Sequence, residues 1–397
     1  MLQEMDREYL LHTYARNYVN FVKGDNATLE DDRGRDYIDF TSGIGVVSVG
    51  HANPILSEAI CDQARRIIHI SNLFLIEPQA RLAKRLVELS GYDMRCFFAN
   101  SGAEANEGAI KIARRYGEVD GQPKRYKVIT LEHSFHGRTI STLKATGQEK
   151  MHHYFGPYPD GFVYAAEIDE IEKLIDDHTV AVMIELIQGE GGVEPQHKER
   201  VQRLARMLKE RDVLLIVDEV QTGIYRTGEL FASNLYEIEP DIITVAKGLG
   251  GGVPIGAVMT RLKEIFKPGD HGSTFGGNYL VSVAAQKVLD ILEAHKNSGA
   301  LDETMLYFAD RLDAYVKRYP NLIEKAVGIG LMRGLRIKNS GLLASILSNA
   351  FDERVLLLKA GRNTLRFLPP LTITKAEAEE GFARLDRAMR KTAAGAK

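Results

Sequence analysis

The sequence has few cysteines, no long apolar run and no excess of one charge. Its two cysteines, Cys61 and Cys96, form no disulfide framework and have no metal-ligand spacing. No secretory or transit segment precedes Met5, so we expect a reducing cytosol. The longest apolar runs are too short to span a bilayer, so we expect no membrane partner. The net charge of −3, with acidic and basic residues interleaved, argues against nucleic acid as a partner.

The composition is that of an ordinary globular protein. A chain of 397 residues, with 44% apolar and 26% charged residues, can bury a large core. Its length predicts two or three domains. No internal repeat is visible, and no linker rich in proline, glycine and serine separates independent domains.

The most informative stretch runs from Val213 to Gly256. Residues 213–217 are branched apolar residues and predict a buried parallel strand, which Asp218 ends. A second apolar run, residues 242–245, leads to Lys247 and a glycine-rich turn. Because ligands bind at the carboxyl ends of strands in open α/β sheets, the carboxylate and the amine could meet one ligand there.

This pair of side chains suits pyridoxal phosphate. A carboxylate beside the pyridine nitrogen keeps that nitrogen protonated, and the ring can then accept electrons from the substrate. A lysine amine can bind the cofactor covalently and later move a proton. Asp218 or Lys247 alone would be explained equally well by a structural role. The order strand, Asp, strand, Lys, glycine-rich turn favours the cofactor.

A second pattern predicts an anion site. Residues 95–99 read as a strand, and Ser101, Gly102 and Ala103 follow it immediately before a helix over residues 104–115. Unpaired backbone N–H groups at a helix start attract an anion. Taken alone, a serine such as Ser101 at a helix start is more often a simple N-cap. His133 and His136 lack a third ligand at a suitable spacing, so we predict no metal site.

Several separated motifs resemble the class III pyridoxal-phosphate aminotransferases. They are the stretch 213–256, SGAEANEGAIKIARR at 101–115, SFHGRT at 134–139, QGEGGV at 188–193 and HGSTFGGN at 271–278. The resemblance runs from about Tyr14 to Pro370, and SNLFLIEPQARLAKRL at 71–86 is similar to the subgroup that acts on N-acetyl-L-ornithine. One departure is Glu185-Leu186, where the family commonly has Glu-Pro.

The resemblance implies an α/β fold of type I among pyridoxal-phosphate enzymes. It has a mostly parallel seven-stranded sheet in a large domain near residues 59–285. The arm and hairpin of residues 1–58 join residues 286–397 in a small α+β domain. The pattern itself predicts an aromatic arm over residues 1–24, a hairpin over 28–40 and a strand over 180–187. It also predicts a helix over residues 375–390 and a disordered tail over 393–397.

The resemblance also assigns the cofactor contacts. Ser101, Gly102 and Ala103 are expected to hold the phosphate, Phe135 to stack on the pyridine ring, and Gln221 to bind the 3-hydroxyl group. Thr274 is expected to reach the phosphate of a partner subunit, which implies a homodimer with shared active sites. On the residues alone, Phe135 could be a core aromatic residue and Thr274 a cap of the following helix.

Four further residues are expected to bind substrate. Arg366 would hold the α-carboxylate of glutamate or 2-oxoglutarate, and Arg138 the carboxylate distal to the reacting carbon. Ser273 belongs to the same expected set. Glu190 would pair with Arg366 when the amino donor has no carboxylate there, since an unpaired buried arginine is costly.

The reaction implied is transfer of an amino group from N-acetyl-L-ornithine to 2-oxoglutarate. It gives N-acetyl-L-glutamate 5-semialdehyde and L-glutamate, a step of arginine biosynthesis. Ornithine, succinylornithine, succinyldiaminopimelate and 4-aminobutyrate are alternative donors. An aminomutase or decarboxylase on the same scaffold is a further alternative. A non-catalytic descendant would be expected to have lost the lysine, whereas Lys247 is present.

Overall fold

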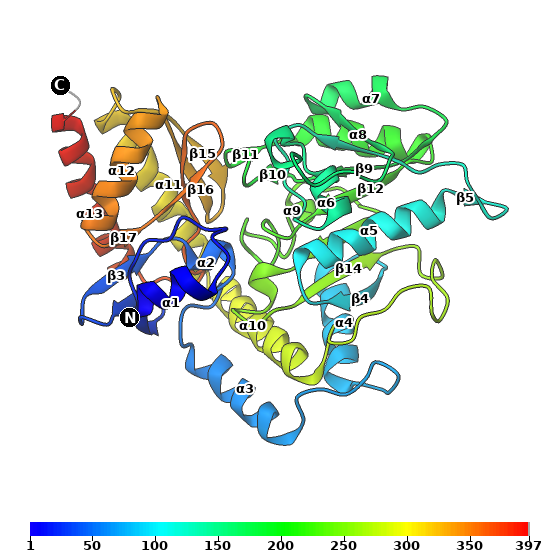
Figure 1. Ribbon diagram of the computed structural model, residues 1–397, viewed down its shortest axis with the longest axis horizontal. Coiled ribbons are helices and arrows are strands. Elements are labelled where there is room, and N and C mark those ends of the chain that lie inside the picture. The colour runs from blue at the N-terminus through cyan, green and yellow to red at the C-terminus, as the bar shows by residue number, and fades with distance from the viewer. Residues whose placement is uncertain (396–397) are drawn as a thin grey trace.

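The computed structural model describes residues 1–395, and its larger lobe is built on a seven-stranded sheet (Figure 1). The strand order is β4 (Arg95–Ala99), β14 (Gly256–Thr260), β13 (Ile242–Val245), β12 (Leu214–Asp218), β9 (Thr179–Ile184), β7 (Lys127–Leu131) and β8 (Phe162–Ala165). Four strand pairings are parallel. Only β14 runs antiparallel to its two neighbours in this sheet. The predicted mostly parallel sheet is confirmed.

The central strands are buried on both faces because their residues are branched and apolar. On β12, Val217 packs into a core with Leu204 of helix α8 (Lys198–Glu210). The neighbouring Ile216 faces the opposite side and packs with Ile112 of helix α5 (Gly102–Tyr116). Successive side chains of a strand point to opposite faces, so one strand serves two helical layers. The carboxyl ends of the strands are left free to carry polar groups.

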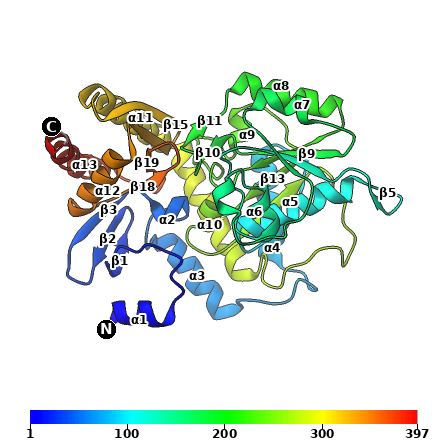
Figure 2. The same cartoon turned by 45° about the horizontal axis from the view of Figure 1, so that its top comes forward.

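The smaller lobe joins the two ends of the chain (Figure 2). Strands β1 (Phe21–Asp25), β2 (Thr28–Asp31) and β3 (Asp36–Asp39) form a sheet with β17 (Val355–Leu356), which pairs with β3 in parallel. A second sheet contains β15 (Ile323–Ile329), β16 (Met332–Ile337), β19 (Thr364–Phe367) and β18 (Leu358–Ala360). The exact domain limits, near residues 58 and 285, stay predictions.

Helices connect and cover the two lobes. They are α3 (Pro54–Arg66), α4 (Glu77–Ser90), α10 (Tyr279–Asn297), α11 (Ala300–Arg318), α12 (Ser340–Asp352) and α13 (Lys375–Gly395). Helix α10 contributes Val288 and Leu292 to an apolar core that includes Phe98 of the large sheet and Phe367 of the small lobe. One core therefore continues from one lobe into the other.

The remaining elements are short. They are α2 (Ser42–Gly45), α6 (Ile140–Ala145), α7 (Ile171–Leu174), α9 (Ala232–Leu235), β5 (Glu118–Val119), β6 (Gln122–Pro123), β10 (Ile187–Gln188), β11 (Glu194–Pro195), η1 (Glu149–Met151), η2 (Ile168–Glu170) and η3 (Lys247–Leu249). None of the helices within residues 1–395 combines the length and the apolar character needed to cross a membrane.

The hairpin over residues 28–40 is confirmed, but three other predicted segments differ. The predicted strand 180–187 stops at Ile184 and resumes as β10 after Glu185 and Leu186. Residues 355–358, whose apolar run VLLL predicts a single strand, belong to two sheets, because Val355 pairs with β3 and Leu358 with β19. The tail prediction is wrong for residues 393–395, which continue α13, and residues 396–397 lie outside the described residues.

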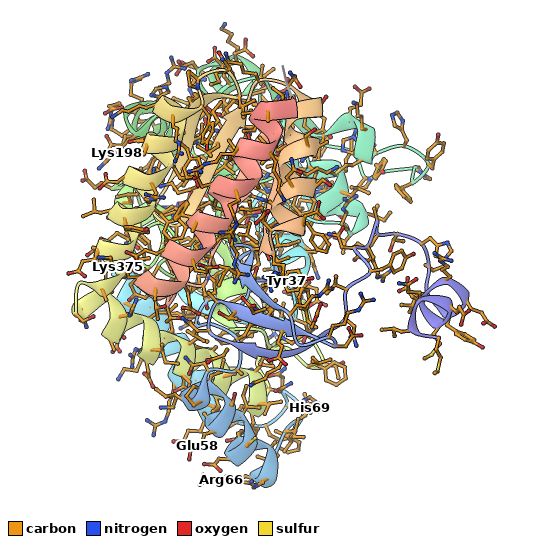
Figure 3. The ribbon with its side chains drawn as sticks, turned by 90° about the vertical axis from the view of Figure 1, so that its left-hand side faces the viewer. Tyr37, Glu58, Arg66, His69, Lys198 and Lys375 are labelled. Carbon is orange, nitrogen blue, oxygen red and sulfur yellow. The ribbon has the colours of Figure 1, made fainter. Side chains whose placement is uncertain are left out.

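The N-terminal arm contains a helix, α1 (Leu2–Tyr9), that stands away from the body of the molecule (Figure 3). Its aromatic residues are exposed: Tyr9 and Tyr14 retain 74% of their accessible surface and Tyr18 retains 52%. Phe21, which lies within the predicted arm of residues 1–24, instead begins strand β1 and packs edge-on against Tyr37.

Candidate active site

A cavity of about 400 Å³ lies at the carboxyl ends of the large-sheet strands. Each strand end supplies part of its wall: Ser101 follows β4, Phe135 follows β7, Glu185 follows β9, Asp218 ends β12 and Lys247 follows β13. The predicted meeting of an acid and an amine at this edge therefore occurs. Gly102, Ala103, Arg138 and Gln221 line the same cavity.

Asp218 is buried and held by three donors. Its Oδ1 accepts a hydrogen bond from the backbone N–H of Val220 at 3.0 Å. Its Oδ2 lies 2.8 Å from both the Asn106 amide nitrogen and His136 Nδ1. These donors fix the carboxylate at the cavity wall. Sequence reasoning missed Asn106 and His136 as its supports, although both lie in motifs of the resemblance.

Lys247 lines the cavity, and its side-chain amine has no hydrogen-bond partner among residues 1–395. Burial lowers the pKa of its amine, while the carboxylates of Glu190, Asp218 and Glu185 oppose that shift. Its backbone has a φ of +39°, in the left-handed region that few non-glycine residues adopt. The amine is therefore available to a ligand in the cavity.

Helix α5 begins at the cavity wall. Ser101 is its N-cap, and the Ser101 hydroxyl accepts a hydrogen bond from the backbone N–H of Glu104 at 3.2 Å. Gly102 and Ala103 are the first two helical residues, so the helix offers their N–H groups no acceptor. The turn can bind an anion even though Ser101 also caps the helix.

Phe135 and Arg138 lie together on the wall. The Arg138 guanidinium carbon lies 5.7 Å from the centre of the Phe135 ring. Arg138 is exposed, and no ion pair occupies it within the described residues. Phe135 is half-buried, so it is not a core residue. Both side chains are placed to meet a ligand.

Arg366 and Glu190 form an ion pair next to the cavity. Arg366 Nη1 lies 2.5 Å from Glu190 Oε1, and the Arg366 side chain is 3% exposed whereas that of Glu190 is 30% exposed. The same Nη1 lies 3.3 Å from the side-chain oxygen of Gln221, which lines the cavity. The buried Arg366 therefore contacts Gln221, a residue of the cavity wall. Its ion-pair partner Glu190 is more exposed than Arg366 itself.

Ser273 and Thr274 lie outside this cavity. Both line a neighbouring hollow of about 860 Å³, and Thr274 is exposed. Ser273 is connected to the cavity, because its hydroxyl accepts a hydrogen bond from the Asn100 amide nitrogen at 3.2 Å and Asn100 lines the cavity wall. Within one chain, Thr274 does not join the other predicted residues.

The cavity fits pyridoxal phosphate. It combines an unpartnered lysine amine, a buried carboxylate and two helix-terminal N–H groups without acceptors. An anion-binding turn and a buried acid on one wall suit a ligand with a phosphate at one end and a basic ring at the other. Across residues 1–395, no cluster of three His, Cys, Asp or Glu side chains could hold a metal ion.

Comparison with known proteins agrees with this geometry. A family profile described as aminotransferase class-III matches residues 11–389, so the chain belongs to the class III aminotransferases. It is 64% identical to the acetylornithine aminotransferase of Wolinella succinogenes over 98% of this chain and 100% of that protein.

Two solved structures show the same fold. The ornithine aminotransferase from Toxoplasma gondii ME49 has a TM-score of 0.93 at 32% identity, covering 99% of this chain and 95% of that one. The N-acetylornithine aminotransferase from Stenotrophomonas maltophilia K279a has a TM-score of 0.83 at 34% identity, covering 99% of this chain and 100% of that one. The family resemblance, the type I fold and the pyridoxal phosphate prediction are confirmed. The protein is a pyridoxal-phosphate-dependent aminotransferase.

Proposed function

We propose that the enzyme transfers the side-chain amino group of N-acetyl-L-ornithine to 2-oxoglutarate, in arginine biosynthesis. The products are N-acetyl-L-glutamate 5-semialdehyde and L-glutamate. The 64% identity to an acetylornithine aminotransferase over nearly the whole chain supports this donor. The single structural observation that carries the proposal is the ion pair of Arg366 and Glu190 beside the cavity.

The residues of the cavity wall would hold the cofactor. Ser101, Gly102 and Ala103 would bind its phosphate, Phe135 and Gln221 would contact its ring, and Asp218 would face the ring nitrogen. When bound, pyridoxal phosphate supplies an electron-accepting ring and a carbon that carries the amino group between the two substrates. His136 and Asn106 keep the Asp218 carboxylate in place.

Lys247 would move the proton. Because burial lowers its pKa, a larger share of its amine is neutral near neutral pH than for an exposed lysine. A neutral amine can take a proton from the substrate carbon that bears the amino group and return it elsewhere. The free position of this amine in the cavity supports that role.

The two arginines explain how one pocket takes two substrates. Glutamate carries a carboxylate beside its reacting carbon, and Arg366 would bind it after Glu190 moves away. N-acetyl-L-ornithine has no carboxylate there, so Glu190 stays on Arg366 and neutralises it. Arg138 is exposed at the cavity and would bind the distal carboxylate of either substrate.

The proposed assembly is a homodimer in the cytoplasm, with Thr274 of one subunit near the cofactor of the other. Leu73 is 90% exposed and lines the same hollow as Thr274, while the adjacent Phe74, Leu75 and Phe275 are 63%, 96% and 58% exposed. Such a group of exposed apolar side chains is typical of an interface. A two-fold axis would then build two composite sites.

Single-substrate reactions test the donor. Cofactor-loaded protein is mixed with N-acetyl-L-ornithine, ornithine, succinylornithine, succinyldiaminopimelate, 4-aminobutyrate or glutamate, without a keto acid. The rate at which the cofactor absorbance changes is then measured. We expect N-acetyl-L-ornithine to have the highest second-order rate constant among the non-glutamate donors. Ornithine is the second candidate, because of the similarity to the Toxoplasma enzyme, and a faster reaction with ornithine would overturn the proposal.

A further inference from the structure

Glu185 is a buried carboxylate on the cavity wall that none of the roles above uses. It lies at the break between β9 and β10, where Ile184 and Ile187 on either side are fully buried. Its Oε2 accepts a hydrogen bond from the backbone N–H of Phe135 at 2.9 Å. Its Oε1 accepts one from the backbone N–H of Gly189 at 3.2 Å. One carboxylate therefore ties two separate turns together.

Both turns carry residues of the proposed mechanism. The first turn presents Phe135 to the cavity, and Gly189 immediately precedes Glu190, the ion-pair partner of Arg366. Only a carboxylate offers one acceptor oxygen to each of the two donors, since a glutamine of the same shape has a single oxygen. The ionised carboxylate is the stronger acceptor for both contacts.

The second turn has little room to move. A Cβ on Gly189 would lie 2.4 Å from the side-chain oxygen of Gln221, and a Cβ on Gly191 would lie 2.7 Å from the carbonyl oxygen of His133. The turn is therefore enclosed by Gln221 on one side and the Phe135 turn on the other. Glu185 fixes its start from inside the protein.

The charge on Glu185 is costly. Burial, helped by the nearby Asp218 carboxylate, raises the pKa of Glu185 to about 7, while His136 and the two backbone donors act in the opposite direction. A purely structural position would be served better by an uncharged residue. The two backbone hydrogen bonds offset part of the cost of burying this carboxylate.

We propose that Glu185 is a positioning residue for the substrate switch: it anchors the turn at Gly189 so that Glu190 reaches Arg366 when the amino donor lacks a carboxylate at that place. The inference rests on the proposed function of the Glu190–Arg366 pair. Loss of the anchor leaves Arg366 poorly neutralised, so the half-reaction with N-acetyl-L-ornithine suffers more than that with glutamate.

The first measurement needs no turnover. Hydrogen exchange followed by mass spectrometry on cofactor-loaded protein should show faster exchange in peptides covering 187–192 and 133–137 of Glu185→Gln than of the unaltered enzyme. Peptides from β12 should not change. Glu219→Gln is the matched control, because Glu219 is also buried and also accepts two backbone hydrogen bonds, from Ala232 and Ser233, but does not itself line the cavity. Unchanged exchange in both Glu185→Gln peptides overturns the anchor.

The second measurement is a double-mutant cycle on the two half-reactions. Glu185→Gln should lower the rate ratio of N-acetyl-L-ornithine to glutamate by roughly tenfold, the value of one lost charge-assisted hydrogen bond. In a Glu190→Gln background it should lower that ratio no further, because the switch is already lost. Glu219→Gln should leave the ratio unchanged. Equal effects of Glu185→Gln in both backgrounds overturn the inference. If the unaltered enzyme does not react with N-acetyl-L-ornithine, the proposed donor is wrong, but the hydrogen-exchange result still tests the anchor.

Discussion

Lys247 has an unusual backbone conformation at the cavity wall. Its φ of +39° costs conformational energy, on the order of 1 kcal/mol or more for a non-glycine residue. The strain occurs where the chain leaves β13 and enters η3, and it directs the amine into the cavity rather than along the strand. The surrounding strands are fully buried, so the fold can maintain this conformation.

Lys247→Ala should abolish transamination while the protein still binds pyridoxal phosphate through Ser101, Gly102 and Ala103. Borohydride treatment of the loaded enzyme followed by peptide mapping should place the pyridoxyl label on Lys247. Lys144→Ala is the control, because Lys144 lies against the rings of Tyr158 and Tyr164, outside the cavity, and should keep full activity. A label on any other lysine contradicts the assignment.

Arg366→Ala should slow the glutamate half-reaction by roughly 100-fold, the equivalent of about 3 kcal/mol for a buried charge-assisted pair. The N-acetyl-L-ornithine half-reaction should change much less, because that donor places no carboxylate on Arg366. Rapid-mixing absorbance measurements with each donor alone give both rates. Arg138→Ala is the comparison and should slow both half-reactions. Equal losses in Arg366→Ala would show that Arg366 does not select the α-carboxylate.

At the scale of elements, a charged contact links β3 to α13 next to the backbone pairing of the two chain ends. Asp36 Oδ2 contacts Arg384 Nη2, Asp36 Oδ1 lies 3.1 Å from Arg354 Nη1, and the Arg384 side chain is 7% exposed. The hydrogen bond with Arg384 lowers the pKa of the Asp36 carboxyl. This contact stabilises the parallel pairing of β3 with β17.

Asp36→Asn should lower the free energy of unfolding by about 1 kcal/mol at neutral pH, a modest value because the Asp36 side chain is half exposed. A carboxyl with a lowered pKa stabilises the folded state above its ordinary pKa, and that contribution is lost as the pH falls through the lowered value. The difference between variant and unaltered protein should therefore vanish in acid. Denaturant unfolding at neutral and acid pH measures it. Asp62→Asn removes an exposed pair with Arg65 and should have no effect at either pH.

At the scale of the whole molecule, one predicted cofactor contact, Thr274, lies outside the cavity of its own chain. Thr274 lies in the hollow beside exposed Leu73, while the anion-binding turn at Ser101 lies in the cavity of the same chain. The arm with α1 also projects from the body (Figure 3). These surfaces are where the proposed second subunit would pack.

Mixed dimers test whether Thr274 acts across the interface. Subunits with Lys247→Ala are dissociated and reassociated with subunits carrying Thr274→Trp, and activity is compared with that of each variant alone. If Thr274 acts on the partner's site, a mixed dimer contains one site with both changes and one with neither, so activity should partly return. If it acts within its own chain, every site keeps one change. No recovery would then contradict the shared site.

The positions of Asp218 and Lys247 near the ends of β12 and β13 could be predicted from the amino-acid sequence. A run of branched apolar residues predicts a buried strand, and a charged residue that ends such a run is expected where the strand leaves the sheet. Asp218, Lys247 and the Ser101 turn could therefore be placed without a structure. The same local signal predicted the hairpin over residues 28–40, because its turn residues and its strands are neighbours in the chain.

Which distant groups meet depends on how the whole chain folds. His136 and Asp218 are 82 positions apart, and no pattern in the sequence paired them. Arg366 and Glu190 are 176 positions apart, and only the family resemblance, not a local pattern, paired them. Strand β9 was predicted to continue to Ile187, yet it ends at Ile184, and the Glu185 carboxylate at this break accepts hydrogen bonds from the backbones of Phe135 and Gly189. The spacing of apolar residues predicts that a residue is buried. The residues that it contacts depend on the register and packing of strands far apart in the chain.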